Sequence, residues 1–169
     1  MNAVQLIHQS KSVQWFTPAP YIDAARRALG GIDLDPASCE EANKTIRALR
    51  YFTEQEDGLG QSWYGRVFCN PPYGGAQVAF TKKMIEEHDA SCMSAGILLV
   101  KAATDTRWFQ PLWDYPLCFT AKRIRFGKPS EVVNRNRPSI GNVFVYLGPE
   151  PQRFYAEFAR FGRCGVLRP

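Results

Sequence analysis

Apolar residues along the chain follow two spacings, and each spacing predicts a different kind of element. Apolar positions three or four residues apart predict helices, in residues 20–29, 38–49, 77–88, a stretch after Thr104, and a closing stretch carrying Phe154, Phe158 and Phe161. Short apolar or alternating runs predict strands, in residues 32–36, 66–69, 96–101, 117–120, 123–126 and 142–147.

The order of these elements indicates the fold class. Strands that alternate with helices imply an α/β fold with a mainly parallel, doubly wound sheet. The last two predicted strands flank a long polar loop, so we expect them to form a C-terminal antiparallel hairpin. No repeat, low-complexity tract or long linker interrupts the pattern. This predicts a single domain over residues 1–169, with residues 1–14 loosely held.

The composition is typical of a soluble globular protein. Hydrophobic residues make up 45% of the 169 residues and charged residues 22%, which is enough apolar material for a real core. No apolar run approaches the roughly 20 residues of a membrane span. Residues 1–11 lack the long apolar stretch of a signal peptide, so we expect a cytoplasmic protein without a membrane partner.

Cysteine and histidine usage argues against a metal site. The five cysteines are odd in number and widely spaced, none forms a CxxC pair, and the chain has only two histidines. We therefore expect neither a zinc site nor a disulfide framework, and we expect the cysteines to be free thiols.

The positive charge is concentrated in one region. Residues 101–137 contain eight basic and three acidic residues, which accounts for the whole net charge of +5. A polyanionic partner such as a nucleic acid would explain this asymmetry, and so would a solvated basic face.

One tetrapeptide, Asn70-Pro71-Pro72-Tyr73, is suited to holding a planar amine for methyl transfer. An Asn side-chain oxygen accepts a hydrogen bond but takes up no proton near neutral pH. Pro71 ends the strand and restricts Asn70 to an extended backbone, which aims this oxygen and a neighbouring carbonyl at one point. Tyr73 offers an aromatic face for stacking. A strand followed by a simple proline turn is the alternative interpretation.

A second Pro-containing segment, Asp35-Pro36, also follows a predicted strand. In doubly wound sheets, ligands bind outside the carboxyl ends of the strands. The shared placement of the two segments favours a functional interpretation of both.

Three segments in this order resemble those of the small phage-encoded DNA N6-adenine methyltransferases of the Dam type. They are Trp15-Phe16-Thr17-Pro18, residues 33–38 and the NPPY tetrapeptide, with supporting matches at residues 57–59, Trp63, 98–100, 104–106 and 108–109. The resemblance spans about residues 15–147. It implies a Rossmann-like, S-adenosylmethionine-dependent methyltransferase fold with a C-terminal antiparallel hairpin.

The resemblance also implies roles for the NPPY residues. In that family the NPPY residues, Pro72 among them, bind the target base. Asn70 and the Pro71 carbonyl would accept hydrogen bonds from the adenine N6 amine, and Tyr73 would stack on the base. The amine would then be more tetrahedral, with its lone pair aimed at the methyl group, which stabilises charge developing in the transition state. A base inside a duplex cannot reach such a pocket, so base flipping is implied.

By the same resemblance, S-adenosylmethionine is the methyl donor. The residues that would bind it are Trp15, Thr17, Pro18, Asp35, Pro36, Ala37, Ser38 and Asp57. Each has a structural alternative as a turn, helix entry or core residue. The usual glycine-rich turn of the broader class is missing after Asp35, and no acidic residue ends a second strand near residues 50–52 to contact the ribose.

DNA contacts are expected from the basic region. The best loop candidate is residues 127–141, and the basic residues assigned to DNA are Lys122, Arg123, Arg125, Lys128, Arg135 and Arg137. Arg suits guanine edges and Asn suits adenine edges, although phosphate contact is the commoner role of a single Arg. No large recognition domain follows the motifs, so sequence readout would come from short loops or from a partner subunit, such as a homodimer.

Three other functions remain open at this stage. Protein glutamine N5-methyltransferases also use NPPY, DNA cytosine N4-methyltransferases are close relatives in mechanism, and a non-catalytic nucleic-acid-binding module could retain the fold. The basic region and the extent of the resemblance favour DNA as the substrate, and adenine N6 is the target that the resemblance implies.

Overall fold

The structure is a computed structural model, and it describes residues 16–127 and 140–166. The predictions for residues 1–14, for Trp15, and for Lys128, Arg135 and Arg137 of the basic loop fall outside the described residues.

The described elements alternate as the sequence predicts. The helices are α2 (Ala19–Leu29), α3 (Glu40–Ile46), α4 (Gly75–Asp89) and α5 (Pro151–Phe158), with a 3₁₀ helix η1 (Gln110–Asp114). The strands are β1 (Leu34–Asp35), β2 (Arg50–Tyr51), β3 (Gly65–Cys69), β4 (Met93–Lys101), β5 (Leu117–Thr120), β6 (Asn142–Leu147) and β7 (Gly162–Gly165).

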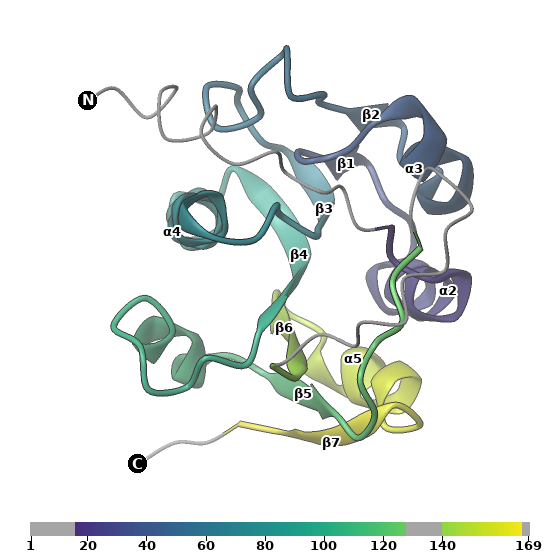
Figure 1. The fold of residues 1–169 in the computed structure, drawn as a ribbon, viewed down its shortest axis with the longest axis vertical. Coiled ribbons are helices and arrows are strands. Elements are labelled where there is room, and N and C mark those ends of the chain that lie inside the picture. Colours follow the sequence, from purple (N-terminus) through teal and green to yellow (C-terminus); the bar gives the residue numbers. More distant parts are fainter. Residues whose placement is uncertain (1–15, 128–139, 167–169) are drawn as a thin grey trace.

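These seven strands form one sheet in the order β2-β1-β3-β4-β6-β5-β7 (Figure 1). Neighbouring strands from β2 to β4 are parallel. β6 runs antiparallel between β4 and β5, and β7 is antiparallel to β5. The sheet is therefore parallel in its first half and antiparallel at its end, which confirms the predicted α/β, Rossmann-like methyltransferase fold class.

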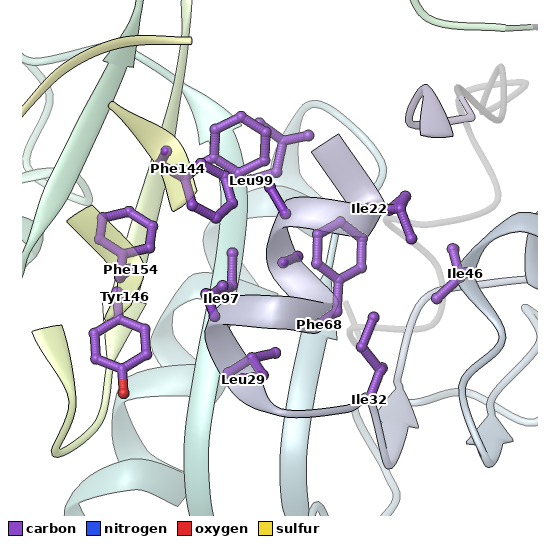
Figure 2. Packing of buried hydrophobic residues seen from close by; sticks show 14 of the residues in the cluster. Ile22, Leu29, Ile32, Ile46, Phe68, Ile97, Leu99, Phe144, Tyr146 and Phe154 are labelled. Atoms are coloured by element: carbon purple, nitrogen blue, oxygen red, sulfur yellow. The ribbon is translucent and has the colours of Figure 1, made fainter. Parts of the chain in front are cut away.

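Helices cover both faces of the sheet, with α4 and η1 on one face and α2, α3 and α5 on the other (Figure 1). The side chains of β3 alternate between these layers. Phe68 packs in the core under α2, α3 and α5 (Figure 2), whereas Val67 and Cys69 face the layer of α4. Because successive side chains of a strand point to opposite faces, a sheet covered on both faces needs a continuously apolar strand.

The expected hairpin differs from the observed one in its first strand. Residues 123–126 form no strand and have no regular secondary structure; Ile124 is buried, and Arg123 and Arg125 are exposed. This segment ends at Gly127, which pairs with Phe16 in an isolated antiparallel bridge. β6 pairs instead with β4 and β5, because all six of its residues are buried and an edge position would leave them exposed.

Two other expectations need correction. The stretch after Thr104 forms turns and the 3₁₀ helix η1, with Trp108 and Phe109 preceding it. The closing helix ends at Phe158, so Phe161 lies beyond it. β7 was not predicted, because Gly162-Arg163-Cys164-Gly165 has neither an apolar run nor a β-branched residue.

Candidate active site

The parallel strands β1 to β4 all end at one edge of the sheet, and the antiparallel strand β6 begins there. β1 ends at Asp35, β3 at Cys69 and β4 at Lys101. The antiparallel strand β6 starts at the same edge, where Asn142 pairs with Lys101. We call this the carboxyl edge. Both Pro-containing segments singled out in the sequence, after Asp35 and after Cys69, lie along it, as predicted.

Asn70 is held at this edge by a residue far away in sequence. Its side-chain Nδ2 donates a hydrogen bond of 3.0 Å to Oγ1 of Thr17, and Thr17 itself is only 5% exposed. Pro18 follows as the residue that caps α2, in an extended conformation. The segment before α2 therefore crosses the end of β3 and fixes the Asn70 amide.

The rest of the tetrapeptide leads directly into α4. Pro71 is buried and Pro72 is half-buried. Gly74 then adopts a φ of 95°, with no atom within 4 Å of where a Cβ would lie. Glycine is required here by backbone conformation and not by lack of space. This turn reverses the chain from β3 into α4 and leaves Tyr73 at the carboxyl edge.

Tyr73 has three described neighbours. Its hydroxyl accepts a hydrogen bond of 3.0 Å from Nδ2 of Asn142. Nζ of Lys101 lies 4.5 Å from the centroid of its ring, and the Phe126 ring meets it edge-on with centroids 6.2 Å apart. Burial raises the pKa of the Tyr73 hydroxyl, so it stays protonated at neutral pH.

Asp35 is a buried carboxylate, 1% exposed. Burial raises the pKa of this carboxyl from 3.8 to about 7, while a hydrogen bond of 3.0 Å from the Ala37 backbone N–H to Oδ1 opposes the increase. Within residues 16–127 and 140–166, no cationic side chain forms an ion pair with Asp35. The ionised carboxylate therefore lacks a full positive partner in the described part of the chain.

Ser38 and Pro36 lie in the same turn. The Ser38 hydroxyl lowers the pKa of Asp35 slightly, yet its Oγ is buried and makes no well-formed hydrogen bond to any described residue. Pro36 is buried, and Ala37 packs partly into the core. The turn after β1 thus contains two buried polar groups, on Asp35 and Ser38, whose hydrogen-bonding capacity is not filled.

The loop that carries Asp57 is pressed against this turn. A Cβ on Gly58 would lie 1.9 Å from the Pro36 carbonyl oxygen, so only glycine permits the approach. Nε1 of the buried Trp63 donates a hydrogen bond of 2.8 Å to the Gly58 carbonyl and anchors the loop. Asp57 has a φ of 50° and its Oδ1 accepts from the Leu59 N–H at 3.2 Å. The structure therefore brings Asp57 and Asp35 to one end of β1.

Sequence reasoning missed Asn142, and it did not decide whether Lys101, near the end of a predicted strand, contacts DNA or the donor. Asn142 is the one polar residue at the head of the apolar strand β6, and that position was the available signal. Lys101 is tied to α4, because its backbone N–H donates to Oε1 of the buried Gln77 at 3.1 Å.

The basic residues predicted to contact DNA are only partly described. Lys122, Arg123 and Arg125 are exposed on the segment that leaves the end of β5, which points to the same carboxyl edge as β4. That segment also carries Phe126 to the Tyr73 ring. Positive charge is thus placed beside the tetrapeptide.

The arrangement offers a buried carboxylate, an oriented amide and an aromatic ring along one edge. A carboxylate can hold ammonium and hydroxyl groups, an amide oxygen can accept from an amine, and a ring can stack on a flat group. Among the residues that the structure describes, no three His, Cys, Asp or Glu residues are grouped to hold a metal ion. Nor is any described helix long and apolar enough to cross a membrane.

Comparison with known proteins assigns the family. A search of curated proteins found no match. The family model for DNA N-6-adenine-methyltransferase (Dam) matches residues 5–148, which is most of the chain and includes every site residue described above. Enzymes of this family methylate adenine in DNA at N6. The chain therefore belongs to the DNA N-6-adenine-methyltransferase (Dam) family.

Proposed function

We propose that this enzyme transfers a methyl group from S-adenosylmethionine to the N6 amine of an adenine flipped out of a DNA duplex. One observation carries the proposal. Asp35 ends β1 and Asn70 follows the neighbouring parallel strand β3, and Thr17 of the segment before α2 is hydrogen-bonded to Asn70 at 3.0 Å. A cation-binding group and an amine-binding group are thereby held together at one edge.

The turn after β1 fits the methyl donor chemically. S-adenosylmethionine carries an ammonium, a sulfonium and ribose hydroxyls. Asp35 is a buried carboxylate with a pKa raised to about 7, and the Ser38 hydroxyl is buried without a well-formed hydrogen bond to a described residue. Charged or hydroxyl groups of the donor would satisfy both.

The residues that would hold the donor are those expected from the sequence. They are Thr17, Pro18, Asp35, Pro36, Ala37, Ser38 and Asp57, with Trp15 from outside the described residues. When bound, the donor supplies an electrophilic methyl group. Asp57 is held near the turn by the contact between Gly58 and the Pro36 carbonyl, which places a second carboxylate where a donor amine or hydroxyl could reach it.

On the acceptor side, Asn70 and the Pro71 carbonyl would accept hydrogen bonds from the adenine amine. The bond to Thr17 uses the Asn70 nitrogen, so the amide oxygen is the atom that accepts. Since neither acceptor is protonated near neutral pH, both can stabilise the positive charge that develops on N6. Tyr73 would stack on the flipped base, and Pro72 would hold the turn that presents it.

DNA would approach from the carboxyl edge. Lys122, Arg123 and Arg125 lie there as exposed residues, and Lys128, Arg135 and Arg137 extend the same positive region in sequence. Contacts of this kind neutralise phosphates and contribute affinity with little sequence preference.

The experiment that tests the proposal is nucleoside mass spectrometry on DNA from a methylation-deficient bacterial host expressing this chain. N6-methyladenine is expected with the parent and not with a host carrying the empty vector. N4-methylcytosine in its place would contradict the choice of base. Well-expressed protein without any modified base would contradict the proposed activity. Titration of purified protein with S-adenosylmethionine by calorimetry tests the donor separately.

A further inference from the structure

The head of β6 holds a buried polar side chain that the proposed chemistry does not use. Asn142 is 1% exposed. Its Nδ2 donates to the Tyr73 hydroxyl at 3.0 Å and to the Val100 carbonyl at 3.4 Å. A backbone carbonyl can only accept, so the amide group facing Val100 must be the nitrogen. The same nitrogen therefore donates to Tyr73.

This orientation leaves the other half of the amide without a partner. Oδ1 of Asn142 is buried and has no hydrogen-bond partner among the described residues. A buried carbonyl without a partner is unfavourable, and an apolar side chain of the same size would avoid that cost. The other five residues of β6 are apolar or aromatic. The contact with Tyr73 is the feature that an apolar residue could not supply.

The Tyr73 ring is restrained in two independent ways. Its hydroxyl lies on the axis about which the ring rotates, so the hydrogen bond from Asn142 fixes where this axis points but leaves the rotation free. Lys101 covers one face of the ring, with Nζ 4.5 Å from the centroid, and this contact opposes the rotation. Asn142 and Lys101 pair across β6 and β4, so one rigid ladder position supplies both restraints.

We propose that Asn142 is a positioning residue for Tyr73, and that together with Lys101 it holds the ring in the orientation in which the flipped adenine stacks on it. This inference rests on the proposed function. A ring already held in its stacking orientation loses little conformational entropy when the base arrives. A ring free to swing would place the base, and hence N6, less accurately for transfer.

The test compares Asn142→Leu and Asn142→Ala with the parent. Leu is close to Asn in size and carries no polar atoms, so Asn142→Leu keeps the packing and removes the buried carbonyl. If the role were only structural, stability would fall together with activity. For a positioning role, Asn142→Leu should melt within a few degrees of the parent. Its kcat/KM for DNA should nevertheless fall about 5- to 100-fold, the range expected when a buried polar group such as the Tyr73 hydroxyl loses its partner.

A spectroscopic readout follows the base directly. The methylated site is first located by sequencing, and 2-aminopurine then replaces the target adenine in a short duplex. Stacking on Tyr73 should quench its fluorescence in the parent complex, and Asn142→Leu should give a brighter complex. Tyr73→Phe removes the same hydrogen bond from the other side. Combining it with Asn142→Leu should therefore cost no more than either change alone.

Thr120→Val is the matched control. It removes a side-chain hydrogen bond of 3.1 Å to the Asn142 backbone carbonyl and does not touch Tyr73, so activity and fluorescence should match the parent. If Asn142→Leu keeps both kcat/KM and fluorescence within twofold of a methylating parent, the inference is overturned while the proposed function stands. If the parent modifies no DNA base, the proposed function and this inference are both overturned.

Discussion

Thr17 and Asn70, which are 53 positions apart in sequence, are joined by a hydrogen bond of 3.0 Å between Oγ1 and Nδ2. Thr17 precedes α2, in a segment proposed to contact the methyl donor, and Asn70 begins the tetrapeptide proposed to bind the base. In this bond the amide nitrogen of Asn70 faces Thr17. The bond also makes the position of the base-binding amide depend on the segment at the donor side.

Asn70→Ala should abolish methylation while donor binding largely survives. Loss of one preorganised polar group that stabilises transition-state charge costs about 10²–10³-fold in kcat. Thr17→Val, which keeps the shape but cannot accept from Nδ2, should reduce kcat by a smaller factor because the amide can then rotate. Single-turnover methylation and calorimetric donor titration measure the two effects. An Asn70→Ala enzyme as fast as the parent would disprove the acceptor role.

Donor affinity should depend on the ionisation of Asp35. The pKa of this carboxyl is raised to about 7 by burial, and a cationic donor binds the ionised form. Affinity should therefore rise as the pH rises toward 7 and level off above it, by up to about tenfold per pH unit at the acid end. Asp35→Asn should bind the donor weakly at every pH, whereas Asp23→Asn, on the surface of α2, should behave as the parent.

The same carboxyl should affect stability with the opposite sign. Because its folded pKa lies above its unfolded value, the folded state binds more protons between pH 4 and 7, and stability without donor falls as the pH rises through this range. Asp35→Asn removes the charge and should raise the melting temperature above pH 7. Thermal denaturation at several pH values measures it. A parallel pH dependence in parent and variant would exclude Asp35 as the cause.

Gly58→Ala should separate the Asp57 loop from the turn after β1. The added methyl group would lie 1.9 Å from the Pro36 carbonyl oxygen, so one of the two segments must move. Overpacking of this kind costs about 1–3 kcal/mol, and we expect weaker donor binding as well as lower stability. Gly165→Ala, where a Cβ meets nothing within 4 Å, is the control. Unchanged donor affinity in Gly58→Ala would contradict the proposed contact between Asp57 and the donor.

Charge reversal beside the tetrapeptide should weaken DNA binding and flatten its salt dependence. Lys122→Glu and Arg125→Glu change two exposed residues on the segment after β5. Each lost phosphate contact lowers the slope of log K against log salt by about 1. The same reversal at Arg135 and Arg137 tests the loop. Lys82→Glu, 76% exposed on α4, is the control, and an equal effect there would indicate that only net charge matters.

Much of the fold could be predicted because the core strands can be recognised from their own residues. β4 and β6 contain the continuous apolar runs 97–100 and 143–147, and burial on both faces requires such runs. The place of β6 could not be predicted, because proximity in sequence favoured pairing with residues 123–126. Those residues lead instead to Gly127, which pairs with Phe16. That contact joins distant parts of the chain and depends on the tertiary structure alone.

The candidate site was predicted where one motif carries both position and chemistry. The four residues Asn70-Pro71-Pro72-Tyr73 indicate both the end of a strand and the hydrogen-bond acceptors proposed to bind the base. Asn142 could not be found in this way, because its partner Tyr73 lies 69 positions away. The register that aligns it with Lys101 exists only in the folded sheet. The close approach of Gly58 to the Pro36 carbonyl could not be predicted either. A glycine can occur in a loop for many reasons, and the sequence does not distinguish them.

The insertion of β6 between β4 and β5 has a consequence for synthesis on the ribosome. β4 is complete at Lys101, but the strand that covers its open side begins 41 residues later, at Asn142. β5 pairs only with β6 and β7 in the described sheet, and both are made after it. During that interval the nascent chain exposes the edge of the nine-residue strand β4, whose residues 97–100 are all apolar, and such edges template aggregation. Chaperone demand should therefore peak just before β6 emerges.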